Sequence, residues 1–136
     1  MVRDLVYAVI QKLSADTNIT ALVGTSIYKY ILPNGAKYPA ITVSDVTTTR
    51  NNGAARVRYA NMRVQCTAWA PTDTGAFTLS ELIGDCLNIQ NNQVYGTAPY
   101  DVRVIGCEDM GSVPDNRPDV PIFMRHRDFM IEYSFV

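Results

Sequence analysis

Hydrophobic residues recur along this chain with two periods, one typical of helices and the other typical of strands. From Leu5 to Leu13 they return every three or four positions, which predicts an amphipathic helix. A short second helical turn follows through residues 21–23. Asp16 or Thr17 can cap this turn, and Gly24 can end it.

Several stretches alternate between apolar and polar residues, as strands with one buried face do. The expected strands are Ala40 to Val46, Val57 to Trp69, Tyr100 to Met110 and Ile122 to Phe135. In the second of these, the apolar face comprises Met62, Val64, Cys66 and Ala68. In the last, it comprises Phe129, Ile131, Tyr133 and Phe135.

A capped helix is predicted between the second and third of these strands, from the cap residues at 72–74 to about Leu87. Its apolar stripe comprises Phe77, Leu79, Leu82, Ile83, Cys86 and Leu87. Ser80, Glu81 and Asp85 fall outside this stripe, so we expect them to face solvent.

The predicted order α-β-β-α-β-β indicates an α+β fold in a single domain spanning residues 1–136. Two hairpins would join in one mainly antiparallel four-stranded sheet with both helices on one face, a two-layer sandwich. The loops of the hairpins would be Thr47 to Arg58 and Gly111 to Pro121. The uncovered face carries Tyr59 and Trp69, and its half-apolar character is typical of a subunit interface.

The composition is that of an ordinary folded domain, with 47% hydrophobic residues, 18% charged residues and a net charge of -1. The small net charge argues against a general nucleic-acid or membrane-surface binder, because such proteins carry a clear basic excess. No segment approaches the roughly 18 to 20 apolar residues of a membrane-spanning helix. We therefore expect a protein that is made and assembled in a cytoplasm.

Candidate catalytic and metal-binding residues are few. The three cysteines, Cys66, Cys86 and Cys107, are not spaced as metal ligands, and His126 is the single histidine. We expect three buried thiols. A nucleophilic pair of Cys66 and His126 would need an orienting group and an oxyanion hole that the sequence does not reveal. We expect no cofactor, no metal and no enzymatic activity.

The loop between the first two expected strands is basic. Four arginines fall within the fourteen positions 50–63, which contain no acidic residue. A solvated hairpin is one interpretation, and a tip that meets phosphate or an acidic partner surface is the other. The candidate contact residues here are Arg50, Asn51, Asn52, Arg56, Arg58, Tyr59 and Arg63.

Further candidate interface residues come from the later strands and the second loop. They are Trp69, Asp115, Arg117, Arg125 and Arg127. Alternation puts Arg125 and Arg127 on one face of the last strand. It puts His126 and Asp128 on the other face, where we expect Asp128 to pair with a neighbouring cation.

Three ordered stretches cover nearly the whole chain and carry a family resemblance. The first is LSADTNITALVGTSIYKYILPNGAKYPAITV, in which an Asp, a Leu-Val-Gly and an Ile-Tyr lead into a proline-flanked turn and a strand. The second is RVQCTAWAPTDTGAFTLSELIGDCL, in which a strand passes straight into a helix, and the third is the closing strand RHRDFMIEYSF. In this order they resemble the tail-terminator, or head-to-tail joining, proteins of long-tailed bacteriophages.

This resemblance implies a structural virion protein without cofactor or catalysis. Such proteins are small α+β domains that form a ring, expected to be a homohexamer, at the head-proximal end of the tail tube. The ring stops polymerisation of the tail tube protein and meets the stopper or adaptor protein of the neck. Double-stranded DNA passes through its hole without specific binding, and no membrane is involved.

Other functions stay open at this point. The nearest alternative is another ring component of the neck, a stopper or an adaptor. Two alternatives belong to other classes: a phosphate- or nucleic-acid-binding module centred on residues 50–63, and a small enzyme that uses Cys66 or His126.

Overall fold

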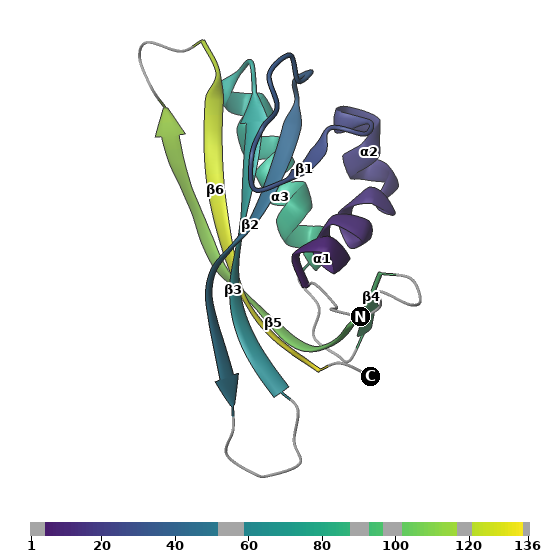
Figure 1. Ribbon diagram of the computed structural model, residues 1–136. Helices are drawn as coiled ribbons and strands as arrows, with labels where there is room; N and C mark the ends of the chain where they lie inside the picture. Colours follow the sequence, from purple (N-terminus) through teal and green to yellow (C-terminus); the bar gives the residue numbers. More distant parts are fainter. Residues whose placement is uncertain (1–4, 52–58, 88–92, 97–101, 117–120, 135–136) are drawn as a thin grey trace.

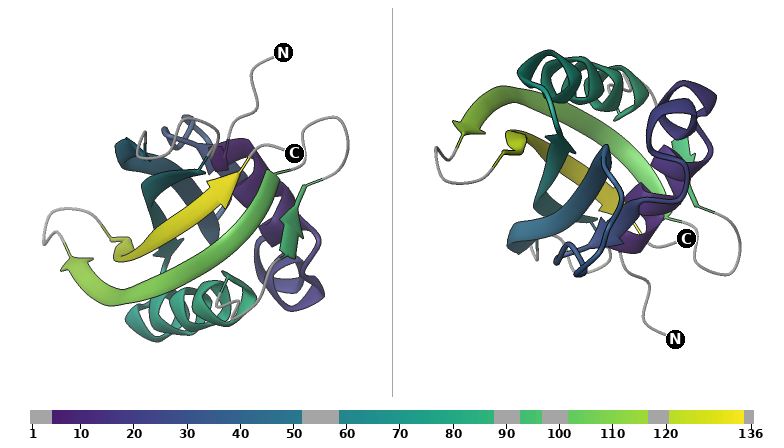
Figure 2. Two further views of the ribbon diagram at one scale, coloured as in Figure 1. Left: turned by 90° about the horizontal axis from the view of Figure 1, so that it is seen from below. Right: turned by 90° about the horizontal axis from the view of Figure 1, so that it is seen from above.

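The computed structural model describes residues 5–51, 59–87, 93–96, 102–116 and 121–134. The elements are α1 (Leu5–Ser14), α2 (Thr17–Val23), β1 (Ile27–Lys29), β2 (Ala40–Asn51), β3 (Tyr59–Ala70), α3 (Asp73–Leu87), β4 (Gln93–Tyr95), β5 (Val102–Asn116) and β6 (Phe123–Ser134). The long strands form a curled sheet beside the helices (Figure 1; Figure 2). Within the described ranges, no helix has the length and apolar character needed to span a bilayer.

The described strands form one mixed sheet in the order β1-β2-β3-β6-β5-β4. β1 pairs with β2 in parallel, and the other neighbouring strands are antiparallel. The predicted α+β class is confirmed, but the predicted four-stranded sheet with two helices is wrong. The prediction missed β1 and β4 as sheet strands because each has only three residues, too few for alternation to identify.

The structure has a third helix, α2, in addition to the two that the sequence predicted. Asp16 caps the start of α2 and so separates it from α1. Its carboxylate accepts hydrogen bonds from the backbone N–H groups of Asn18 at 2.9 Å and Ile19 at 3.3 Å. These bonds satisfy donors that a helix start leaves unpaired. Gly24 ends α2 with a φ of 59°, which glycine adopts without strain. The cap and the stop predicted from the sequence are therefore confirmed.

β2 and β5 both run further than the alternation of side chains predicted. β2 continues to Asn51 by pairing with residues 59–63 of β3, and β5 continues to Asn116 by pairing with residues 123–127 of β6. Bulges interrupt both ladders, which breaks the regular alternation on which the prediction relied. A large part of each expected loop is therefore strand.

The core lies between the helices and one face of the sheet. The buried residues of the central strands are Met62, Val64, Cys66 and Ala68 of β3 and Phe129, Ile131 and Tyr133 of β6. They belong to one cluster with Leu5, Val9 and Leu13 of α1 and Leu79, Ile83 and Leu87 of α3. The expected apolar faces of both strands are therefore confirmed within the described residues.

The predicted orientation of α3 is wrong at two positions. Phe77 is 47% exposed, whereas Ser80 is fully buried. Ser80 lies beneath Arg127, whose Nη1 donates to the Ser80 carbonyl oxygen at 3.4 Å. The stripe was chosen by side-chain polarity alone, which cannot anticipate a buried polar contact of this kind.

Arg127 connects α3 to β5, and its side chain is only 12% exposed. Its Nη2 lies 2.6 Å from Asp109 Oδ2, and its Nη1 lies 3.1 Å from Glu81 Oε1. Burial by itself lowers the pKa of Arg127, but the hydrogen bonds and charges of Asp109 and Glu81 outweigh burial, so the pKa is raised. Gly84 gives the guanidinium its space, since a Cβ there would lie 2.8 Å from the Arg127 Cζ.

Replacing Gly84 with alanine should therefore destabilise the protein. Helix propensity alone favours alanine by about 1 kcal/mol, so a net loss of roughly 1 to 3 kcal/mol would report the displacement of Arg127. Urea unfolding of the full chain measures the difference. Gly106→Ala is the matched control, because a Cβ at Gly106 would meet nothing within 4 Å. Equal effects of the two substitutions would contradict this role of Gly84.

Candidate functional site

The end of the β2–β3 hairpin extends beyond the helices (Figure 1). Its last paired residues are Asn51 and Tyr59, and Arg50 precedes them in the ladder. These three residues are predicted contact residues, and the structure places them on the paired strands β2 and β3. The predicted contact residues that lie outside the described ranges are Asn52, Arg56, Arg58 and Arg117. The sheet thus places the start of the basic segment at one extremity of the molecule.

The sheet face opposite the core carries polar side chains that bond to one another. Arg63 Nη2 lies 2.6 Å from Asp128 Oδ2, which confirms the expected pairing of Asp128 with a cation. The Oγ1 of Thr67 lies 2.9 Å from Nδ1 of His126, and Nε2 of His126 lies 3.0 Å from Oδ2 of Asp115. These bonds link β3, β5 and β6 on this face.

Trp69 continues this polar surface toward β2. Its Nε1 donates a hydrogen bond of 3.0 Å to the Oγ1 of Thr42. Thr42 and Thr67 are both buried, although they lie on the face away from the helices. The polar side chains of this face are therefore held in place by their neighbours, and they present a fixed surface.

The sequence did not reveal the chain of Thr67, His126 and Asp115, because only the strand register brings these residues together. A hydroxyl, an imidazole and a carboxylate are also the groups of a hydrolase triad. Here, however, Thr67 is buried and is paired on both sides, with Thr42 and His126. The backbone N–H groups of two central strands are committed to ladders and form no oxyanion hole. The arrangement serves to fix the strands.

The structure does not bring together the two residues considered for nucleophilic catalysis. Cys66 faces the core, whereas His126 lies on the opposite face of the sheet. The expectation of three buried thiols holds for Cys66 but is wrong for Cys86 and Cys107, which are half-buried. Burial is the main cause that raises the pKa of Cys66 far above its ordinary value, and the nearby Cys107 is the second. Burial also raises the pKa of Cys86 to about 12 with help from the Asp16 charge, and that of Cys107 to about 12 with help from the Asp109 charge. A raised pKa disfavours the reactive thiolate.

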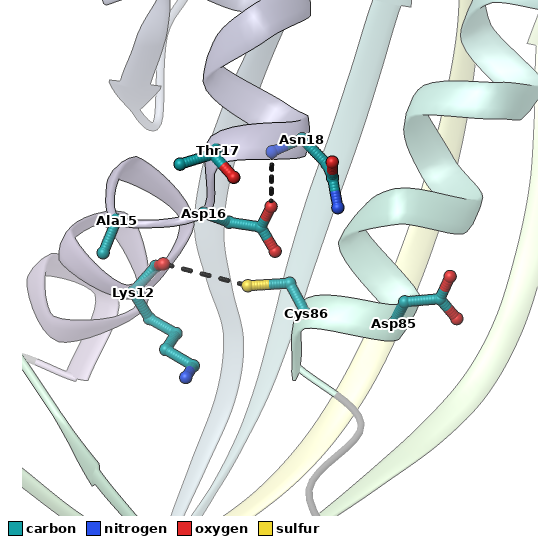
Figure 3. A pocket seen from close by; sticks show the side chains of 7 residues that line it. All are labelled: Lys12, Ala15, Asp16, Thr17, Asn18, Asp85 and Cys86. Carbon is teal, nitrogen blue, oxygen red and sulfur yellow. Dashed lines mark hydrogen bonds between the residues drawn. The ribbon is translucent and has the colours of Figure 1, made fainter.

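A cleft of about 440 Å³ lies between the α1–α2 junction and the end of α3 (Figure 3). It is lined by Lys12, Ala15, Asp16, Thr17, Asn18, Asp85 and Cys86. The carboxylates of Asp16 and Asp85 point in different directions, and the Lys12 ammonium points away from Asp16 (Figure 3). Among the described residues, no three His, Cys, Asp or Glu side chains could hold a metal ion together. The cleft therefore offers no converging set of ligands.

The raised thiol pKa values predict slow labelling of the native protein by a disulfide reagent at about pH 8. Thiols with a pKa of about 12 are ionised to only about one part in 10⁴ at that pH. The free energy of unfolding should also fall as the pH rises from about 9 to about 12, because unfolded thiols ionise while folded thiols stay protonated. A native cysteine that reacts as fast as in the denatured chain would contradict this.

Comparison with known proteins supplies the family. The model of the family described as "Tail completion protein gp17" matches residues 7–107. No curated protein sequence matches the chain significantly. A chain of the solved structure "Virion of native gene transfer agent (GTA) particle" is similar in fold, with a TM-score of 0.71 and 18% identity over 96% of this chain and 94% of that chain.

The family match covers most of the chain and agrees with the resemblance found in the sequence. At 18% identity, the likeness to the virion chain shows a shared fold. The protonated thiols, the fixed polar face and the non-converging cleft fit a protein that acts by contact. This chain belongs to the tail completion protein gp17 family and is a structural tail or neck protein of a phage-like virion.

Proposed function

We propose that the chain forms a homohexameric ring that caps the head-proximal end of the tail tube and joins the tube to the stopper or adaptor protein of the neck. The observation that carries this proposal is the tail completion match over residues 7–107. The fold shared with a chain of a phage-like particle supports it. The subunit is made in the host cytoplasm and ends in the virion, and it has no catalytic role.

The shape of the subunit supports assembly through unlike surfaces. A cyclic ring with more than two members joins one patch of each subunit to a different patch of its neighbour. The end of the β2–β3 hairpin reaches past the helices (Figure 1), and the polar sheet face is formed by side chains of β3, β5 and β6. In the proposed ring, the hairpin is an arm that contacts the neighbouring subunit, the tube or the lumen.

The charges of the described residues support a lumen through which DNA slides without specific binding. Each phosphate that a protein neutralises adds to electrostatic affinity. Arg63 is neutralised by Asp128, and Arg127 is neutralised by Asp109 and Glu81. With these pairs closed and a net charge of -1, the subunit as a whole has no basic excess to hold the duplex.

The ring is tested by mixing the purified chain with tail tubes of the particle that encodes it. We expect light scattering and negative-stain images to reveal rings at one end of each tube, and tube growth to stop. A chain that stays monomeric and leaves both tube ends free to grow would refute the proposed function.

The arm is tested by replacing residues 52–58 with an Asn-Gly turn, which suits a two-residue hairpin. The fold should be kept, because the β2–β3 ladder still ends at Asn51 and Tyr59. We expect an unchanged urea midpoint but fewer capped tubes and fewer infectious particles.

A full-length hairpin with Arg56→Gln and Arg58→Gln is the matched control, because it keeps the reach of the arm and removes its charge. Capping lost only in the shortened chain assigns the effect to reach, and capping lost in both chains assigns it to charge. Normal capping by both variants would show that the arm makes no contact needed for joining.

A further inference from the structure

Arg125 and Arg127 lie two positions apart on the helix side of β6, yet their surroundings differ. Arg127 contacts two carboxylates, those of Asp109 and Glu81. Arg125 makes no ion pair within the described residues: its Nη1 donates to Ser112 Oγ at 3.2 Å, and its Cζ lies 5.1 Å from the centre of the Phe77 ring. One of the two guanidinium groups is therefore left without a counter-charge.

The Arg125 guanidinium is also incompletely hydrogen-bonded. Its Nε is buried and has no partner, and its Nη2 makes no hydrogen bond to any described residue. A partly desolvated cation with an unpaired donor and no counter-charge destabilises the free subunit. A carboxylate brought to the outer nitrogens would supply the missing charge and accept hydrogen bonds from the planar fork.

Phe77 forms the floor of this site. It is 47% exposed on α3, and its ring holds one face of the guanidinium by a cation–π contact. A stacked guanidinium loses less freedom when it binds, because its plane is already fixed. An exposed aromatic ring beside an arginine is typical of the residues that dominate the energy of protein interfaces.

The chemistry of the site favours a carboxylate over a phosphate backbone. Binding to a nucleic-acid backbone needs several cations along one track. Here Arg125 stands beside Arg127, whose charge is already balanced by Asp109 and Glu81. A single cation on an aromatic floor fits a single acidic side chain.

The same chain carries suitable acids on other surfaces. Asp45, Glu108 and Glu132 are exposed and make no ion pair within the part of the chain that the structure describes. Glu108 and Glu132 belong to the neighbouring strands β5 and β6. A ring contact needs two different patches on one chain, and this cationic site and these acids are such a pair.

We propose that Phe77 and Arg125 form a binding site for an acidic side chain of a second copy of this chain. This inference rests on the proposed ring and names one of its contacts. Each subunit would receive one carboxylate from its neighbour at the junction of α3, β5 and β6.

Arg125→Gln should weaken self-association of the full chain in sedimentation equilibrium by roughly tenfold or more. It should also flatten the salt dependence of association. Arg103→Gln is the matched control, because Arg103 is exposed on β5 and loses the same charge. Phe77→Ala should weaken association with only a small change in the urea midpoint, because the ring is half exposed. Equal association of the Arg125 and Arg103 variants would overturn the inference.

A photo-crosslink identifies the partner directly. With Phe77→p-benzoylphenylalanine, irradiation of the assembled chain should join position 77 to a peptide of a second copy that contains Asp45, Glu108 or Glu132. Crosslinks only to DNA or only to another virion protein would overturn the inference. If the Arg125→Gln variant forms normal rings, this inference is overturned and the proposed function stands. If the unaltered chain never forms rings, the proposed function is refuted as well.

Discussion

The orientation of α3 depends on the contacts of the largely covered Arg127 guanidinium. Hydrophobic packing has no direction, so by itself it would let a helix slide or turn on the sheet. Arg127 bonds to Ser80 and Glu81 on α3 and to Asp109 on β5, which fixes both position and rotation. Removing one partner would leave a partly desolvated charge uncompensated, which destabilises the fold. The surface that α3 exposes, Phe77 included, follows from this contact.

The side chains of β6 give the two faces of the sheet different chemistry. Alternation along this strand sends Arg125 and Arg127 toward α3 and sends His126 and Asp128 to the opposite face. β3 supplies bonding partners on the polar face, and β5 supplies them on both faces. One strand thus supplies a structural ion pair, an arginine without a counter-charge among the described residues and a fixed polar surface.

Local patterns in the sequence were enough to predict much of the fold. The cap at Asp16, the bounds of α3 and the buried face of β3 follow from short-range rules, and the structure agrees with them. For the candidate site, the sequence predicted the face of the sheet on which a residue lies but not the residue that it contacts. That Arg63 is the partner of Asp128, or that Thr67 meets His126, depends on a strand register set by residues about 60 positions apart. Bulges and three-residue edge strands leave no pattern that alternation can detect.

The order β1-β2-β3-β6-β5-β4 also has a consequence for biosynthesis. The strand that joins the two halves of the sheet is the last described element of the chain, and its ladder with β3 closes over a long sequence separation. Until β6 is made, β3 and β5 each have an unpaired edge, and the core lacks the buried residues of β6. Folding is therefore expected to be late and slow. A nascent chain with two such edges is exposed to aggregation until translation passes β6.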